Sequence, residues 1–152
     1  MIVRIMRHGD APTIEGMRQL SAKGIAEART MGQWLSEQSL TDTILISPLL
    51  RAQQTATEVM AYFKHDFKKA DESLLKPEAD ASLTIEYFQA LEAESLLLIS
   101  HMPLVVNLLE AWLPGAGRYF PTAAIAELEI NDDSVELAQF ITPADLSELK
   151  LG

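Results

Sequence analysis

Short apolar runs alternate along the chain with stretches in which apolar residues recur at helical spacing. Runs at 2–7, 43–46 and 95–100 are rich in Val, Ile and Leu, which is typical of buried strands. After each run the period changes to that of an amphipathic helix. We expect helices over 21–38, from Ser47 to Phe63, over 82–92 and from Pro103 to Pro114, with Ser21 and Ser47 as the N-caps of the first two. A terminal hairpin is expected over 123–130 and 134–141.

Strands that alternate with helices favour an α/β domain with a mostly parallel central sheet, whose last strands can run antiparallel. A further short strand is expected near Phe67. At 152 residues the chain has the usual length of one domain, so we assign a single domain to residues 1–152. Hydrophobic residues make up 48% of it, which is enough for a proper core.

Unusual polar side chains stand where the expected strands end. Arg7 and His8 follow the first strand, Ser47 and Arg51 follow the second, and His101 follows the strand at 95–100. The carboxyl ends of parallel strands share one edge of the sheet, where ligands of open α/β sheets bind. We therefore expect two arginines and two histidines to meet in one pocket.

The charge balance limits what such a pocket can bind. The chain carries 22 acidic and 12 basic side chains, a formal net charge of −10. A surface of this sign repels polyphosphate backbones, so nucleic acid is excluded as an expected partner. Any anion must bind in a local basic pocket. Guanidinium forks match the oxygens of a phosphoryl group, which makes that group the expected ligand.

Other classes of protein are disfavoured by what the sequence does not contain. There is no cysteine, and no run of about 18 apolar residues that would span a membrane. The amino terminus does not have the pattern of a secretory signal. No metal-ligand cluster is visible. We expect a cytoplasmic monomer with no membrane attachment, no cofactor and no metal.

Four segments together resemble the signature motifs of the histidine phosphatase superfamily, which is also called phosphoglycerate mutase-like. They are RHGDA at 7–11, LSAKGIAEA at 20–28, SPLLRAQQTA at 47–56 and ISHMPLV at 99–105. The short chain and FPTAAIAELEI at 120–130 are similar to the branch of small protein phosphohistidine phosphatases. The resemblance implies a three-layer α/β/α fold with the site at the carboxyl edge of the sheet.

The resemblance also implies a role for each polar residue of the pocket. His8 is the nucleophile that accepts phosphate. The proton on its second ring nitrogen must be fixed by a hydrogen-bond acceptor, for which we expect a backbone carbonyl near Gly9. Arg7 and Arg51 clamp the phosphoryl oxygens, and His101, as an imidazolium, donates a further hydrogen bond. Two further residues are candidate substrate contacts: Arg18 and Ser47.

The general acid of the family has no clear counterpart here. Larger members, which act on phosphate monoesters, carry a carboxylate between the second and third motifs. In this chain five carboxylates remain open as candidates: Asp10, Glu15, Glu72, Glu78 and Asp80. The conjugate acid of imidazole has a pKa of about 6.5, so an imidazole leaves with modest help. The gap therefore favours phosphohistidine over sugar phosphates as substrate.

The predicted substrate is a phosphohistidine on another protein. The segment between the second helix and the strand at 95–100 is short, so it leaves little room for a helical lid over a small metabolite. Phosphotransfer domains of signalling relays are the expected partners, and phosphocarrier proteins of sugar transport are a second possibility. Two alternatives stay open, a small-molecule phosphomonoesterase of the same superfamily and a phosphate-binding module without catalysis.

Overall fold

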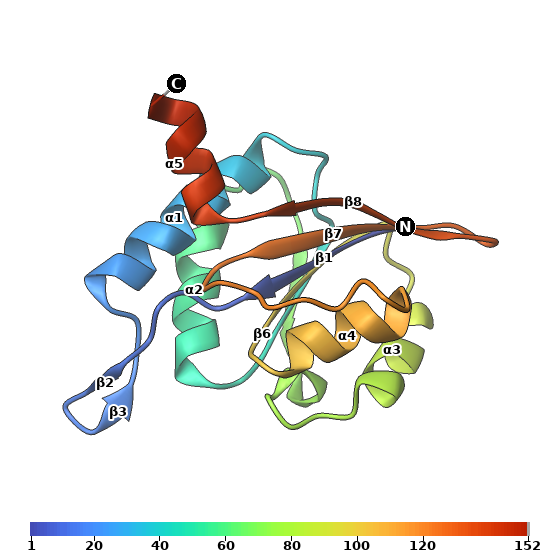
Figure 1. Ribbon diagram of the computed structural model, residues 1–152, viewed down its shortest axis with the longest axis horizontal. Helices are drawn as coiled ribbons and strands as arrows, with labels where there is room; N and C mark the ends of the chain where they lie inside the picture. Colours follow the sequence, from blue (N-terminus) through green and yellow to red (C-terminus); the bar gives the residue numbers. More distant parts are fainter. Residues whose placement is uncertain (152) are drawn as a thin grey trace.

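The computed structural model describes residues 1–151 and contains two sheets and five α-helices within that range (Figure 1). The large sheet is built from β1 (Ile2–Arg7), β4 (Thr43–Ile46), β5 (Lys68–Asp71), β6 (Ser95–Ser100), β7 (Ile125–Ile130) and β8 (Val135–Ile141). The helices are α1 (Ala22–Ser36), α2 (Leu50–Met60), α3 (Ala81–Gln89), α4 (Leu104–Trp112) and α5 (Pro143–Leu151). Smaller elements are β2 (Thr13–Ile14), β3 (Met17–Arg18) and the 3₁₀ turn η1 (Ser73–Leu75).

The six-stranded sheet has the order β5-β4-β6-β1-β7-β8. Its first four strands are parallel, β7 pairs antiparallel with β1, and β8 pairs antiparallel with β7. Arg7 at the end of β1 is in register with Ser100 at the end of β6. The expected mostly parallel sheet is therefore confirmed, and the chain leaves both central strands at one edge.

Helices cover both faces of the sheet, which confirms the three-layer α/β/α fold. Side chains alternate between the two faces along each buried strand. On β1, Val3 and Ile5 face the core beneath α3 and α4, whereas Met6 faces the core beneath α1 and α2. β6 is buried at every position, as expected for a central parallel strand. No helix in the described part of the chain is long and apolar enough to span a bilayer.

Three local features differ from the expectations. The β2–β3 hairpin, which projects from the end of β1, and α5 were not predicted (Figure 1). Ser47 was expected to cap the second helix, but α2 begins at Leu50 with Leu49 as its N-cap and no side-chain cap. This prediction was wrong by a few residues, and the hydroxyl of Ser47 is left for another partner.

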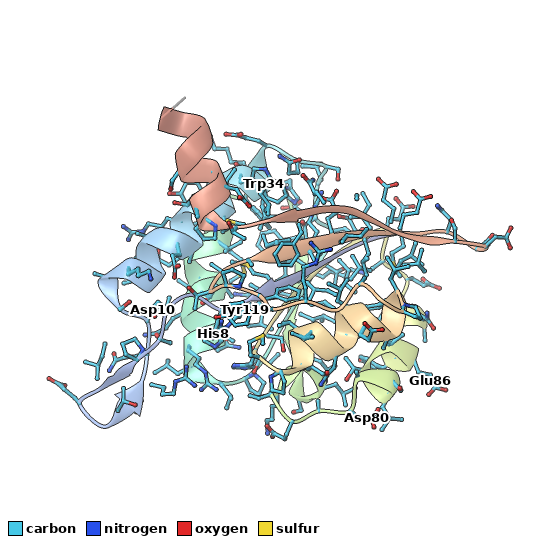
Figure 2. All side chains as sticks on the ribbon, in the orientation of Figure 1. His8, Asp10, Trp34, Asp80, Glu86 and Tyr119 are labelled. Atoms are coloured by element: carbon cyan, nitrogen blue, oxygen red, sulfur yellow. The ribbon has the colours of Figure 1, made fainter. Side chains whose placement is uncertain are left out.

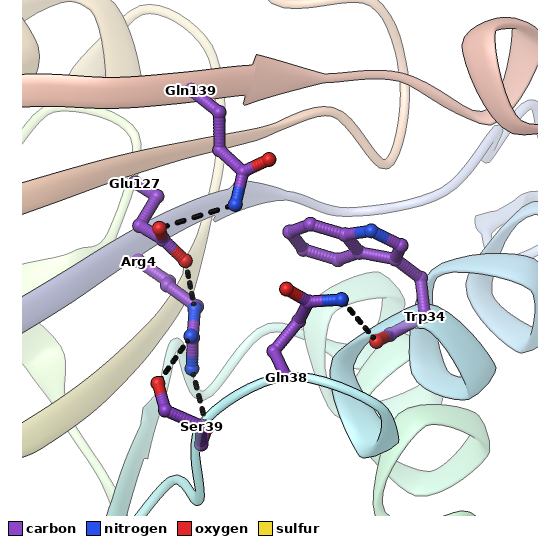
Figure 3. Close-up of polar contacts among 6 residues, drawn as sticks. All are labelled: Arg4, Trp34, Gln38, Ser39, Glu127 and Gln139. Atoms are coloured by element: carbon purple, nitrogen blue, oxygen red, sulfur yellow. Dashed lines mark hydrogen bonds and ion pairs between the residues drawn. The ribbon is translucent and has the colours of Figure 1, made fainter.

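A buried arginine ties β1 to its neighbours on the side of α1 (Figure 3). Arg4 donates from Nε to Glu127 on β7 at 2.7 Å, and from its two terminal nitrogens to the carbonyl and hydroxyl of Ser39. Gln139 on β8 donates to the other carboxylate oxygen of Glu127 at 3.1 Å. Every nitrogen of this guanidinium has a partner, as a buried charge requires.

The loop after β1 lies backbone against backbone on the first turn of α1. Ser21 is the N-cap of α1, as predicted, and its hydroxyl accepts the N–H of Gly24 at 3.0 Å. A Cβ at Gly24 would fall on the carbonyl oxygen of Asp10, and one at Gly9 would lie 2.6 Å from the carbonyl oxygen of Gly24. Only glycine permits this approach, which fixes the loop that carries His8.

Gly24→Ala is expected to lower the free energy of unfolding, although alanine is the better helix former by about 1 kcal/mol. The new methyl group collides with backbone rather than with a movable side chain, so the net cost is roughly 1–3 kcal/mol. Urea denaturation measures it. Ala26→Ser, at an exposed position of the same helix, is the control and should change stability by less than about 1 kcal/mol. Unchanged stability of Gly24→Ala would show that the loop is not held by this contact.

Candidate active site

The two histidines singled out in the sequence lie side by side at the carboxyl edge of the sheet. His8 follows β1 and His101 follows β6, and both side chains are almost fully buried. Their ring centroids are 5.1 Å apart at an interplanar angle of 61°. Figure 2 shows His8 near Tyr119, on the segment that leads into β7. Three segments that are distant in sequence therefore meet at one point.

A backbone carbonyl holds the ring of His8. Nδ1 of His8 donates to the carbonyl oxygen of Gly9 at 2.7 Å, so in the neutral ring Nε2 keeps its lone pair. The Gly9 N–H donates in turn to the hydroxyl of Thr55 at 3.1 Å, and that hydroxyl donates to the carbonyl of Arg51 at 2.8 Å. Helix α2 therefore positions the loop of the nucleophile candidate as well as its own arginine.

Three buried nitrogens around these rings have no hydrogen-bond partner. Within the described residues, five buried side-chain polar atoms are unpartnered, and three of them belong to the site: Nε of Arg7, Nε of Arg51 and Nδ1 of His101. An unpaired buried polar group costs about 1–3 kcal/mol, more when it is charged. An anion that accepts from all three would remove this cost, so the arrangement suits a phosphoryl group.

The remaining nitrogens of Arg7 fix its direction. Nη1 donates to the carbonyl oxygen of Phe120 at 2.8 Å and lies 3.2 Å from the hydroxyl of Tyr119. The guanidinium also lies over the Tyr119 ring, 5.8 Å from its centroid. These contacts come from the chain just before β7, so β7 supports the site although it contributes no catalytic candidate of its own.

Ser47 contacts His101. The Ser47 hydroxyl oxygen lies 2.6 Å from Nε2 of His101, and both side chains are buried. Ser47 was expected as a candidate substrate contact. In the structure its hydroxyl faces the second histidine.

Burial and the surrounding arginines favour the neutral form of both histidines. Burial, together with Arg7, Arg51 and Arg18, lowers the pKa of His8 to about 4, although its bond to Gly9 acts in the opposite direction. Burial, followed by the neighbouring His8 and the same arginines, lowers the pKa of His101 to about 3. A neutral His8 is what a nucleophile requires. The free protein does not favour the imidazolium expected at His101.

Arg18 acts on the site from the β2–β3 hairpin. Its Nε donates to the carbonyl of Ala11 at 2.9 Å, and its side chain is exposed. Its charge contributes to the lowered pKa of Arg51, although burial is the larger cause. The structure therefore brings Arg18 within the electrostatic reach of the pocket.

None of the five carboxylates considered as general acids is hydrogen-bonded to a site residue within residues 1–151. Asp10 accepts from Ser21 at 2.7 Å, and Glu72 and Asp80 cap η1 and α3. Figure 2 shows Asp80 on the far side of the molecule from Asp10. Glu15 lies at the hairpin turn, with φ of 52°, and Glu78 is exposed.

Two contributors were missed from the sequence. Thr55 belongs to a quoted segment, but the bond to Gly9 that gives it a role connects two helix-loop units 46 residues apart. Phe120 contributes a backbone carbonyl, for which a sequence contains no signal.

The family model described as histidine phosphatase superfamily (branch 1) matches residues 3–76. Phosphohistidine phosphatase SixA of Escherichia coli K12 is 38% identical over 140 residues, which cover 87% of each chain. A SixA homolog of Haemophilus influenzae is 34% identical over 119 residues, 69% of this chain and 73% of that one.

Solved structures give the same result. The structure of the protein histidine phosphatase SixA complexed with tungstate matches with a TM-score of 0.89 and 35% identity, over 96% of this chain and 99% of that one. An alpha-ribazole-5'-P phosphatase of Escherichia coli matches with a TM-score of 0.73 over 94% and 98% of the two chains. At 16% identity, this second match shows the fold alone.

Acid should destabilise the protein through these two rings. Unfolded histidine has a pKa near 6.5, so between pH 6.5 and about 4 the unfolded chain binds protons that the folded chain does not. The free energy of unfolding should therefore fall as pH falls through this window, by roughly 2 kcal/mol per histidine between pH 7 and 5. Replacing both with asparagine should make the loss smaller. Urea denaturation at both pH values, in phosphate-free buffer, measures this, and equal losses in both proteins would refute it.

Proposed function

The chain belongs to the histidine phosphatase superfamily, and we propose that it removes phosphate from a phosphohistidine on another protein. The observation that carries the proposal is the set of three buried, unpartnered nitrogens on Arg7, Arg51 and His101, together with the fixed ring of His8. The phosphohistidine phosphatase of Escherichia coli, 38% identical, supports the substrate chemistry.

The proposed first step is transfer of the phosphoryl group to His8. The lone pair on Nε2 of His8 attacks phosphorus, and the bond from phosphorus to the substrate's imidazole nitrogen breaks. The substrate ring carries a proton on its other nitrogen, so the electron pair of that bond stays on the leaving nitrogen and the ring departs as a neutral imidazole. Arg7, Arg51 and His101 stabilise the oxygens of the transferring group, because their unpartnered nitrogens are donors already in place.

Water completes the cycle. It attacks the phosphorus of phosphorylated His8 and loses a proton, and the bond between phosphorus and Nε2 breaks. The ring of His8 recovers its lone pair, and inorganic phosphate leaves. The Gly9 carbonyl keeps the proton of Nδ1 in place throughout, which fixes the ring that reacts twice. This scheme uses no metal, and metal independence stays a prediction.

The surface around the site supports a protein as the carrier of the phosphohistidine. Seven large apolar side chains are exposed among the residues whose exposure is described, and four stand on segments that border the site: Ile14, Met17, Leu50 and Tyr119. The hairpin, the start of α2 and the approach to β7 supply them. Exposed apolar groups beside a catalytic centre are suited to protein contact.

We propose that the carrier is a phosphotransfer domain of a signalling relay or a phosphocarrier protein of sugar transport. Helix α3, in the segment between α2 and β6, packs on α4 and lies beside it, away from the β2–β3 hairpin at the edge of the sheet (Figure 1). A histidine on the convex surface of a folded domain can reach such an edge. Monomeric state stays a prediction.

Incubation with a phosphohistidine donor and rapid acid-free denaturation should trap about one phosphate on the protein. Intact-mass spectrometry or labelled phosphate detects it. His8→Ala should abolish trapping because no other ring nitrogen occupies that position. His65→Ala, which removes a histidine beyond the carboxyl end of α2 whose ring contacts the carbonyl of Thr41, is the matched control and should trap as the wild type does. Trapping that survives His8→Ala would refute the nucleophile.

The exposed side chains that border the site form an apolar rim of Ile14, Met17, Leu50 and Tyr119. Replacing members of this rim should reduce turnover of protein substrates only. Ile14→Ser, Met17→Ser and Leu50→Ser each remove an exposed contact, so kcat/KM on a phosphorylated phosphotransfer domain or phosphocarrier should fall roughly 5- to 30-fold. Turnover of phosphoimidazole, which touches only the pocket, should not change. Steady-state assays on both substrates measure the difference.

Leu83→Ser on α3 is the matched control, since Leu83 is 60% exposed but lies away from the site. It should leave both activities unchanged. Equal loss on the protein and on phosphoimidazole would count against a docking role for the rim. Faster turnover of phosphoglycerate or nitrophenyl phosphate than of any phosphohistidine would favour the phosphomonoesterase alternative.

A further inference from the structure

Ser47 and His101 form a pair whose hydrogen-bond direction can be worked out. The Ser47 side chain is fully buried, and its hydroxyl oxygen lies 2.6 Å from Nε2 of His101. The other ring nitrogen of His101, Nδ1, is buried and has no partner. Either the serine or the ring supplies the shared proton, and the two choices give His101 opposite properties toward a phosphoryl group.

The hydroxyl of Ser47 has one proton to donate. Its oxygen accepts the N–H of Leu49 at 3.4 Å, so its remaining described contact is with His101. If Nε2 carried the proton, the buried hydroxyl would have no acceptor, and such an unmet donor is costly. The hydroxyl therefore donates to Nε2, and Nε2 is the unprotonated nitrogen.

A neutral imidazole with an unprotonated Nε2 carries its proton on Nδ1. Nδ1 of His101 is buried and unpartnered, on a ring whose centroid lies 5.1 Å from that of His8, so its N–H is available to a ligand. In the other tautomer, a lone pair at Nδ1 would meet the lone pairs of a phosphoryl oxygen and repel them.

We infer that Ser47 is a positioning residue, whose hydroxyl holds His101 in the tautomer with the proton on Nδ1, so that a neutral His101 donates to the phosphoryl group. This rests on the proposed function only in naming that group. The inference gives Ser47 a role through His101 instead of through the substrate. It also replaces the expected imidazolium with a neutral donor, which needs no proton from solution.

Nitrogen-15 NMR of the full chain at pH 7 with tungstate bound tests the tautomer without any turnover. His101, assigned from the spectrum of His101→Asn, should show a protonated Nδ1 and an unprotonated Nε2. In Ser47→Ala the proton should shift toward Nε2. A protonated Nε2 or a doubly protonated ring in the wild type would overturn the inference, as would an unchanged tautomer in Ser47→Ala.

A double-mutant cycle tests the consequence for catalysis. Ser47→Ala should lower kcat on phosphoimidazole roughly 5- to 100-fold. An asparagine at 101 carries an amide N–H that needs no serine to orient its proton, so Ser47→Ala should cost little in the His101→Asn background. Equal losses in both backgrounds would show that Ser47 acts in another way.

Ser95→Ala is the matched control, since Ser95 is a buried serine at the other end of β6 whose hydroxyl has no partner. It should change neither kcat nor the His101 spectrum. If phosphoimidazole is not a substrate, nitrophenyl phosphate serves in the same cycle, so failure of the proposed substrate stays distinct from failure of the serine's role. Loss of kcat with the pH profile unchanged between pH 6 and 8 is the expected pattern, because His101 is neutral throughout.

Discussion

The site depends on the hydrogen-bond partner of one ring nitrogen in each histidine. Nδ1 of His8 has an acceptor, the Gly9 carbonyl at 2.7 Å, which leaves Nε2 with a lone pair. Nε2 of His101 lies 2.6 Å from the hydroxyl of Ser47. A hydroxyl that donates to Nε2 leaves Nδ1 with the proton. We propose that two identical side chains, whose ring centroids lie 5.1 Å apart, thereby take opposite roles, His8 as the nucleophile and His101 as a donor.

Two arginines on the same strand show what distinguishes a functional cation from a structural one. Arg4 and Arg7 both lie on β1, and both are at least partly buried. Arg4 is saturated by Glu127 and Ser39, so no ligand would gain from approaching it. Arg7 keeps a buried Nε without a partner, although its Nη1 is held firmly by backbone. Incomplete pairing, more than the presence of an arginine, marks the site.

Much of this arrangement could be predicted because strand ends are local features and parallel strands share an edge. That rule alone predicts that the residues following β1, β4 and β6 lie close together at one edge of the sheet. Contacts between segments distant in sequence could not be predicted in this way. The hydroxyl of Thr55 and the carbonyl of Phe120 contact site residues, but the spacing of residues in the sequence does not indicate that their segments lie there. Ser47 was misjudged as a helix cap because a serine before a proline has that form, while its true partner lies 54 residues away. Among the residues of α5 whose side chains are described, Leu146 is the one that packs partly buried against the core, and a single such contact gives no periodicity to indicate a helix.

The pocket stabilises the departure of an imidazole and of an alkoxide to different extents. Its donors neutralise charge on the phosphoryl oxygens, which helps any phosphoryl transfer. They do nothing for the departing atom, and Asp10, the carboxylate nearest to His8 in sequence, accepts from Ser21. An alkoxide would leave as a strong base without a proton, whereas a substrate ring that carries a proton on its other nitrogen leaves as neutral imidazole, a weak base with a conjugate acid pKa of about 6.5. In the proposed mechanism, stabilisation placed only around phosphorus favours a phosphoramidate over an alkyl ester, so the chemistry of the bond contributes to substrate choice before any contact with its carrier does.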